Sequence, residues 1–379
     1  MPPCAGGTAT ASVTVTIQYP EPTVHISADP VTIMQKESAT LTWSTTDADS
    51  VTIGPDIGAV DTSGSIAVSP METTTYTAVV TGPGGTVTAS ATVTVTSPIT
   101  LTITSPIDGA TINRPDTMVQ GTITNTTGNE TGITINGVLA LIQGTQFVAN
   151  HVPLQEGENT ITAVAVDTAG YLAQASITVY SQITGDYITI TANPESGIAT
   201  LDTTLRIDAT FTPSMIDIVK LPGGPDPLEY LPGSESNETI ARLDQTGLYF
   251  FTAIAEDDQG NSYIDTVAVQ VINEAVLDGL LRAKWEGMKA RLLVGDVEGA
   301  LDYFSVPSRN EYNEIFTILS EDLVDIANGM EDIDLIYIEE NVAKYRIRND
   351  QEISGESHRL TYYIYFIKDP YGIWFIDSF

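Results

Sequence analysis

The sequence has little cysteine, few basic residues and no long apolar run. Its only cysteine is Cys4, which excludes an internal disulfide and a cysteine-based metal cluster. No run approaches the roughly 18 apolar residues that cross a bilayer, so we expect no membrane insertion within this chain. Lys and Arg number 15 against 49 Asp and Glu, a formal net charge of −34. Such a field repels phosphate backbones and excludes nucleic acid as a partner.

The composition is nevertheless that of a folded chain with more than one domain. Apolar residues make up 42% of the 379 residues, which distinguishes the chain from an acidic disordered tail. At typical domain sizes of roughly 100 to 150 residues, this length predicts two to four domains. Aromatic residues are sparse at first, 13 before residue 275 and 15 from there on. The basic residues show a similar bias, 5 before residue 275 and 10 after it, so a different kind of domain begins there.

A pattern of strand, turn and strand occurs three times before residue 275. It opens with an aromatic or aliphatic residue followed by Thr-Ala, at Tyr76, Ile161 and Phe251. A turn with Gly, Asp or Asn follows, and then a run in which apolar and polar residues alternate. Alternation with a period of two buries one face of a strand, so each pattern predicts a β-hairpin. Each unit also opens with a short strand that ends at a proline, namely Pro30, Pro106 or Pro194.

These three units resemble bacterial immunoglobulin-like modules. The resemblance implies antiparallel β-sandwiches over residues 21–97, 98–182 and 183–273. In the first unit, Trp43 resembles the tryptophan that lies buried between the two sheets, and Tyr76 resembles the aromatic residue of the penultimate strand. The third unit leans toward the polycystic-kidney-disease-like variety. Because units of this length can close their own cores, and the connectors between them are short, we expect a fairly stiff rod of successive sandwiches.

The first twenty residues duplicate part of the first unit. Residues 6–16 nearly repeat residues 84–94, at a constant offset of 78. We therefore interpret residues 1–20 as the remnant last strand of a truncated immunoglobulin-like repeat. They show no basic start followed by an apolar stretch. The hypothesis is that an export signal lies upstream and that the protein is extracellular or at the cell surface.

From residue 274 to residue 379 the pattern predicts helices and then strands. Apolar residues recur at helical spacing from Leu277 to Leu292, and Gly295 suits the end of that helix. Asp296 is placed to cap a second helix, and the capping box that starts at Ser308 predicts the start of a third. A short fourth helix and four strands follow. This order resembles the nuclear-transport-factor-2-like (cystatin-like) cone, so the fold class is mainly β: tandem immunoglobulin-like sandwiches plus a C-terminal α+β domain.

Two sets of residues are candidates for a site. The resemblance to the cone implies a pocket, for which the candidates are Tyr303, Tyr312, Tyr345, Tyr363, Tyr365 and Trp374, with core packing as the alternative. Calcium is the most defensible cofactor, with no other expected, because the loop that carries Asp257, Asp258 and Asn261 offers hard oxygen ligands. The same residues are also common in plain turns. His25 and His151 are isolated and expected at the surface or a sheet edge, and His358 is expected in a turn.

No nucleophile triad, phosphate-binding glycine loop or metal-binding histidine pair occurs. We therefore expect a non-enzymatic surface protein, in which the sandwiches form a spacer or adhesion stalk and the last domain binds an unknown protein or glycan. One alternative is a carbohydrate-binding accessory region of a polysaccharide-active enzyme, which would need exposed aromatic residues in a row. The other is a pocket enzyme of the isomerase or dehydratase type, which would need a buried ionisable group facing a cavity.

Overall fold

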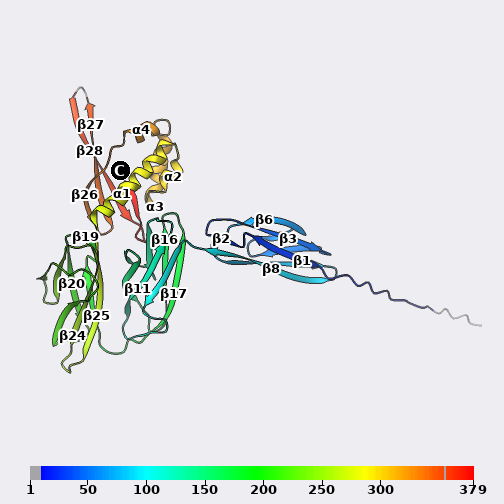
Figure 1. Ribbon diagram of the computed structural model, residues 1–379, viewed down its shortest axis with the longest axis horizontal. Coiled ribbons are helices and arrows are strands. Elements are labelled where there is room, and N and C mark those ends of the chain that lie inside the picture. Colours follow the sequence, from blue (N-terminus) through cyan, green and yellow to red (C-terminus); the bar gives the residue numbers. More distant parts are fainter. Residues whose placement is uncertain (1–9, 354–355) are drawn as a thin grey trace, which may run out of the picture. The chain divides into compact units, whose positions relative to one another are not determined.

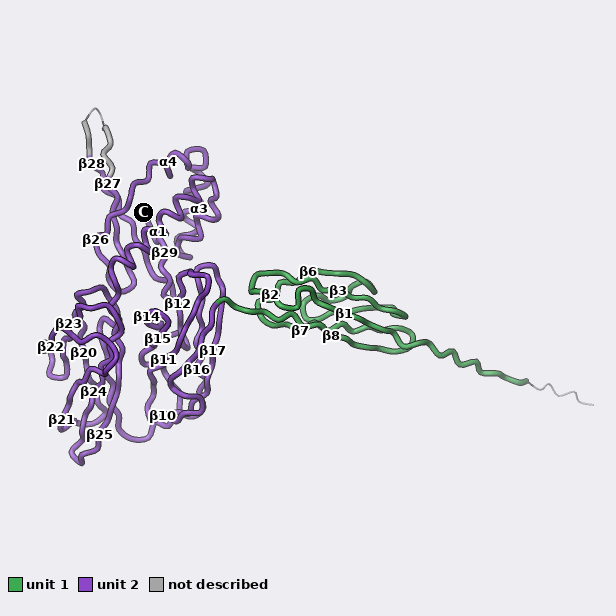
Figure 2. Tube along the Cα trace, viewed as in Figure 1, with its two compact units in different colours: residues 1–98 green, residues 99–379 purple. Residues whose placement is uncertain are grey.

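The computed structural model describes residues 10–353 and 356–379, without the side chains of residues 349–358. Cys4 and the side chain of His358 therefore lie outside the described residues. The chain divides into two compact units, residues 1–98 and 99–379 (Figure 2). The predicted remnant strand falls partly on residues 1–9, which are not described. Residues 10–20 form no strand, and their side chains are exposed.

Unit 1 is a two-layered β-sandwich. Its smaller sheet has the order β1-β3-β6 and its larger sheet the order β2-β8-β7-β4-β5. Trp43 is buried between them, and its indole Nε1 donates to the Asp61 carbonyl at 2.8 Å. Tyr76 is buried in the same core, as the resemblance implied. The strands are β1 (Thr23–Asp29), β2 (Thr32–Met34), β3 (Ala39–Thr46), β4 (Ser50–Gly54), β5 (Gly58–Val60), β6 (Ser63–Val68), β7 (Thr74–Gly82) and β8 (Gly85–Thr96).

The second sandwich begins unit 2. One sheet has the order β14-β15-β11-β9 and the other β10-β17-β16-β12-β13. Its core is separate from that of unit 1 and is built around Phe147. The strands are β9 (Ile99–Ser105), β10 (Thr111–Ile112), β11 (Asp116–Asn125), β12 (Thr131–Ile135), β13 (Val138–Leu139), β14 (Leu141–Gln143), β15 (Gln146–Pro153), β16 (Gly157–Asp167) and β17 (Leu172–Ser181).

The third sandwich has two four-stranded sheets, in the orders β18-β20-β23-β22 and β19-β25-β24-β21. Tyr249 and Phe251 are the largest side chains of its core. The strands are β18 (Ile188–Asn193), β19 (Ser196–Ile198), β20 (Leu201–Ala209), β21 (Met215–Lys220), β22 (Glu229–Pro232), β23 (Glu238–Leu243), β24 (Gly247–Glu256) and β25 (Ser262–Ile272).

All three sandwiches change sheet at the predicted proline. The first strand of each ends at the residue before Pro30, Pro106 or Pro194. A short strand follows that pairs in parallel with the last strand of the same sandwich: β2 with β8, β10 with β17, and β19 with β25. Because proline has no N–H to donate to a ladder, it suits the point where the chain leaves one sheet for the other.

The C-terminal domain has four helices followed by an antiparallel meander, β26-β27-β28-β29. The capping-box prediction for the third helix was three residues late: α3 begins after Ser305, and the Ser308 hydroxyl bonds Ser305 and Asp377 instead. The elements are α1 (Glu274–Leu293), α2 (Val297–Leu301), α3 (Val306–Ile318), α4 (Leu323–Gly329), β26 (Asp334–Glu339), β27 (Val342–Ile353), β28 (Glu356–Lys368) and β29 (Trp374–Ser378). Figure 1 shows the helices on one side of β26, β27 and β28.

Within unit 2, the second and third sandwiches lie side by side (Figure 1). The outer faces of their sheets share a small apolar cluster of Leu141 and Val148 with Leu248 and Ala268. This explains why β15 and β25 lack the usual alternation: residues 147–150 and 267–271 are all buried. The expectation of sandwiches joined only as a stiff rod is therefore wrong for this pair, because each buries an outer face against the other.

Candidate functional site

The six predicted pocket residues do not surround one pocket. Tyr345, Tyr312 and Trp374 are buried in the core between the helices and the sheet, as the alternative of core packing anticipated. The Tyr345 hydroxyl donates to Asp278 Oδ1 at 2.9 Å. Burial is the main cause that raises the pKa of the phenol, and the Asp278 carboxylate raises it further. The Tyr312 ring stacks on Phe379. These side chains stabilise the interior of the domain.

Tyr303 lies elsewhere, in a cleft between the second sandwich and the C-terminal domain. The cleft has a volume of about 500 Å³ and is also lined by Asn129, Lys284, Asp302 and Phe375. Tyr303 packs over Gly287, where a Cβ would come within 2.5 Å of the phenol oxygen. A methyl group at this position would therefore force the Tyr303 ring to move away from α1.

The last two candidates, Tyr363 and Tyr365, lie on the outer face of the C-terminal sheet. In β27 the side chains of residues 343, 345 and 347 are buried, and Lys344 lies on the opposite face, where it pairs with Tyr365 and Tyr337. The Lys344 Nζ atom is 4.1 Å from the ring centroid of Tyr363 and 5.1 Å from that of Tyr365. Tyr363 is 47% exposed and Tyr337 37%. We name Tyr337, Lys344, Tyr363 and Tyr365 the tyrosine face.

The geometry of the sheet sets the spacing of the tyrosine face. Tyr337 and Tyr365 lie on the two strands that flank β27, so their backbones are about 10 Å apart across the sheet. Tyr363 and Tyr365 are two residues apart along β28, so they share a face and lie about 7 Å apart. Hydrogen bonding to Tyr365 raises the pKa of Lys344, so this lysine is a cation that holds the rings in place. The result is an aromatic surface on which Tyr337 and Tyr363 are exposed and Tyr365 is half-buried.

The predicted calcium loop is a hydrogen-bonded turn. Asp257 Oδ1 accepts from the backbone N–H groups of Gln259 and Asn261 at 2.9 and 2.8 Å. Its Oδ2 accepts from the Asn261 side-chain amide at 2.7 Å, and these bonds lower the pKa of Asp257. Among the described residues, no group of three or more His, Cys, Asp or Glu side chains is placed to hold a metal ion. Calcium binding by Asp257, Asp258 and Asn261 stays a prediction.

The same turn occurs in two other hairpins. Asp167 Oδ1 accepts from the N–H groups of residues 169 and 171, and Asp369 Oδ1 from those of residues 371 and 373. The fourth residue of each turn is a glycine with positive φ, at Gly170, Gly260 and Gly372. Aspartate is therefore used at these turns to satisfy backbone donors. The prediction of plain turn chemistry accounts for the structure of all three.

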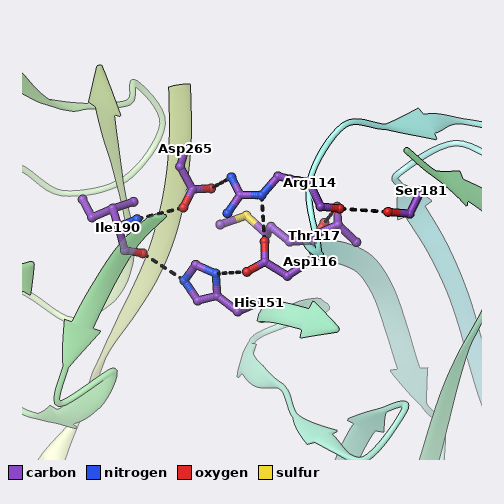
Figure 3. A network of polar contacts seen from close by, with 8 residues as sticks. Arg114, Asp116, Thr117, His151, Ser181, Ile190 and Asp265 are labelled. Carbon is purple, nitrogen blue, oxygen red and sulfur yellow. Dashed lines mark hydrogen bonds and ion pairs between the residues drawn. The ribbon is translucent and has the colours of Figure 1, made fainter. Parts of the chain in front are cut away.

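A buried polar network joins the second and third sandwiches (Figure 3). Arg114 contacts Asp265, whose Oδ2 accepts from the Ile190 N–H at 2.8 Å. Asp116 contacts Arg114 Nε at 2.7 Å and His151 Nδ1 at 3.3 Å, while His151 Nε2 lies 2.9 Å from the Ile190 carbonyl. The expectation that His151 is a surface or edge residue is therefore wrong, because β15 lies inside its sheet and faces the neighbouring sandwich. His25 is exposed, as expected.

The edge of β25 is covered by a side chain from the second sandwich. The Asn150 amide donates to the Ala268 carbonyl at 2.9 Å and accepts from the Ala268 N–H at 2.9 Å. Both groups lie beyond the end of the short partner strand β19. Asn150 thus satisfies two backbone groups that would otherwise be buried without a partner.

A carboxylate joins the second sandwich to the C-terminal domain. Glu130 Oε2 forms an ion pair with Lys284 Nζ at 2.6 Å, and Oε1 accepts from the Trp374 N–H at 3.1 Å. Burial raises the pKa of Glu130 although Lys284 opposes the shift. Gly132 lies nearby, where a Cβ would come within 2.2 Å of the Tyr371 carbonyl oxygen. These contacts hold the tyrosine face on a body that includes both sandwiches.

The fold and these sites define a class of protein: immunoglobulin-like β-sandwiches followed by an α+β domain. Residues 98–183 match the family described as glucodextranase, domain B. This supports the immunoglobulin-like interpretation for the second sandwich. The finer resemblance of the last domain to the nuclear-transport-factor-2-like cone stays a prediction. No curated protein matches the chain.

Solved structures of multi-sandwich proteins give weaker likenesses. A Bacteroides ovatus mixed-linkage glucan utilization locus protein, SGBP-B, in complex with a heptasaccharide, is 14% identical over 68% of this chain and 72% of its own, with a TM-score of 0.26. Fibronectin(III)-like modules of Clostridium thermocellum CbhA are 16% identical over 46% of this chain and 95% of their own, with a TM-score of 0.18. Titin domains I67–I69 are 15% identical over 66% and 98%, with a TM-score of 0.19.

The sequence held signals for several residues that it did not identify as functional. Tyr337 lies in a predicted strand, but a register shift between Leu335 and Tyr337, which alternation does not predict, places it opposite Lys344. Asn150 and Gln270 are polar residues in apolar runs, which is a sign that both faces of a strand are covered. Gly132 interrupts a strand, which marks a close approach of another backbone. In the described part of the chain, no helix is both long enough and apolar enough to span a membrane.

Proposed function

We propose that the protein is a non-catalytic extracellular or cell-surface protein that binds a polysaccharide through the tyrosine face. Residues 99–379 act as a single head that carries this face, and the first sandwich acts as a spacer. The observation that carries the proposal is that Tyr337, Tyr363 and Tyr365 lie around Lys344 on the outer face of the sheet. The carbohydrate alternative requires exposed aromatic residues in a row, and the C-terminal domain supplies them.

The chemistry of the tyrosine face suits a sugar chain. Ring faces carry partial negative charge and pack against the polarised C–H groups of a pyranose, while phenol hydroxyls and the Lys344 ammonium can bond its hydroxyls. The spacing of about 10 Å between Tyr337 and Tyr365 is roughly that of a disaccharide unit in an extended chain. Rings held on strands lose little conformational entropy on binding. An extended glycan can therefore contact two or three rings at once.

The net charge narrows the ligand to neutral polysaccharides. The whole chain carries a formal charge of −34, and such a field disfavours polyanionic glycans at ordinary ionic strength. One lysine at the centre of the tyrosine face does not reverse that field. The match of the second sandwich to glucodextranase domain B supports an association with glucan chemistry.

Affinity gel electrophoresis of the full chain tests the proposal. Gels contain dextran, mixed-linkage β-glucan or, as an anionic comparison, alginate. We expect one of the neutral polymers to retard the protein, and the triple variant Tyr337→Ala, Tyr363→Ala, Tyr365→Ala to weaken that affinity tenfold or more. Tyr180→Ala is the matched control, because Tyr180 is an exposed strand tyrosine on the second sandwich. Retardation that is equal for the triple variant and the control contradicts the proposal, as does retardation by alginate alone.

A further inference from the structure

A small cavity lies where the second sandwich, the third sandwich and the C-terminal domain meet. Its volume is about 230 Å³. The second sandwich contributes Leu139 and Leu141, the third contributes Gln270, and the C-terminal domain contributes Leu277 and Trp374. Most of this lining is apolar. The cavity shares no residue with the tyrosine face, and it adjoins the cleft of Tyr303 at Glu130 and Leu280.

The cationic side chain of Lys368 also lines this cavity. Among the described residues, Lys368 Nζ has no carboxylate within ion-pair distance and no hydrogen bond; its one close contact is the Trp374 ring, with the centroid 5.2 Å away. The acidic residue of the lining is Glu130, which forms an ion pair with Lys284 through Oε2 and accepts from the Trp374 N–H through Oε1. Lys368 is partly buried, and its ammonium, with three unused donors, is stabilised by any acceptor that reaches it.

We propose that this cavity binds a small monocarboxylate with an apolar body, and that Lys368 pairs with the carboxylate. The carboxylate supplies a direct acceptor that Glu130 and Glu340, which act on Lys368 from beyond ion-pair distance, do not, and the leucine and tryptophan side chains enclose the apolar body. A neutral molecule of the same shape would fill the volume without satisfying Lys368. The chemical class of the ligand thus follows from the combination of an apolar lining with one cation.

The protonation of Lys368 gives a signature of the bound state. Burial lowers the pKa of this lysine, with Glu130 and Glu340 opposing the shift. A bound carboxylate favours the ammonium form, so binding takes up protons at any pH at which the free Lys368 is partly deprotonated. Because the cavity is formed by three domains, the ligand also stabilises their junction and raises the unfolding temperature of unit 2.

Isothermal titration of the full chain with hexanoate, at pH 8.5 in two buffers of different ionisation enthalpy, tests the site. We expect saturable binding with proton uptake, and at least tenfold weaker binding of hexanol and hexanamide. Lys368→Met keeps the length and packing of the side chain and should reduce hexanoate affinity at least tenfold. Lys289→Met is the control, because Lys289 pairs with Glu286 within α1 and does not line the cavity.

Three results would overturn the proposal. They are the absence of hexanoate binding, equal binding of hexanol and hexanoate, and hexanoate affinity that is unchanged in Lys368→Met. The comparison of hexanoate with hexanol uses the unaltered protein, so it does not depend on how any variant folds. Loss of polysaccharide binding by the tyrosine variants leaves this site untouched, because the two surfaces share no residue.

Discussion

The last strands of the first and third sandwiches occupy the same place in their folds and have opposite surroundings. In β8 the outward row is solvent-exposed, and Thr92 and Ser90 pair with threonines of β7 at 2.9 Å. In β25 the corresponding row continues from Thr266 into Ala268 and Gln270, which are buried against the second sandwich. The outer face of β8 in the first sandwich is therefore exposed to water. The outer face of β25 in the third sandwich is covered by the second sandwich. The difference between the two rows lies in only a few side chains.

This difference bears on function because it fixes the surface that presents the tyrosine face. The polar network around Arg114 and the contacts of Asn150 and Glu130 hold the three domains of unit 2 together through non-covalent interactions. A ligand that touches the C-terminal sheet then acts on a body of residues 99–379. A sandwich that faces solvent on both sides supplies no such support.

The largest predicted effect comes from a charge placed in the covered row. Ala268→Lys would bury an ammonium between two sheets, and we expect it to lower the free energy of unfolding of unit 2 by about 3 kcal/mol or more. Thr92→Lys, at the equivalent position of β8, should change the stability of unit 1 by less than about 0.5 kcal/mol. Scanning calorimetry of the full chain measures both. Similar effects at the two positions would remove the distinction between the rows.

A methyl group at Gly132 should separate the second sandwich from the C-terminal domain. Gly132→Ala places a Cβ 2.2 Å from the Tyr371 carbonyl oxygen, and we expect a loss of about 1–3 kcal/mol from overpacking. Gly279→Ala is the matched control, because that glycine has no heavy atom within 4 Å and lies in α1. Denaturant unfolding followed by tryptophan fluorescence gives both values. Stability that is unaffected by Gly132→Ala would show that the two domains do not approach as described.

Loss of the Asn150 amide should open the edge of β25. Asn150→Ala leaves the N–H and carbonyl of Ala268 without their partner, with an expected cost of about 1–3 kcal/mol. Hydrogen exchange of the peptide that spans residues 262–272 should become faster, while the peptide that spans residues 85–96 in β8 should not change. Exchange that stays slow in the variant would show that the Ala268 amide is protected by something else.

The smallest effect is a dependence of the interface on pH. Both ring nitrogens of His151 face acceptors, Asp116 and the Ile190 carbonyl, so the doubly protonated ring satisfies both. Burial alone would lower the pKa of His151, but Asp116 and then Asp265 raise it overall. Arg114 and Glu195 are the other charged groups nearby, and the His151 hydrogen bond and Arg114 lower the pKa of Asp116 despite its burial.

A raised histidine pKa contributes stability that is complete below the unfolded value, about 6.5, and that is lost as pH rises through the folded value. The lowered pKa of Asp116 has the opposite effect, because the stability that it contributes is lost as the pH falls through the folded value. Exchange of the 262–272 peptide, corrected for intrinsic rates, should therefore speed up from pH 6 to pH 8. In His151→Gln, whose amide can still donate to Ile190, that dependence should disappear. Equal pH dependence in both proteins would assign it to another group.

Much of the fold could be predicted from alternation and turn chemistry. The hairpins, the strand ends at Pro30, Pro106 and Pro194, and the helix that ends at Gly295 follow from local rules. The burial of an outer face could not, because alternation states which residues share a face and not what covers it. For the same reason the sequence assigns Tyr345 and Tyr363 to one pocket. In the sheet Tyr345 pairs with Ile364 and Tyr363 pairs with Arg346, and these neighbouring pairs point to opposite faces.

Calorimetric unfolding of the full chain tests the central claim most directly. If residues 99–379 form one body, unit 2 unfolds in a single cooperative transition whose calorimetric and van't Hoff enthalpies agree, separate from the transition of unit 1. Ala268→Lys should then shift the whole unit 2 transition and leave the other in place. Separate transitions for the second sandwich, the third sandwich and the C-terminal domain would contradict the claim.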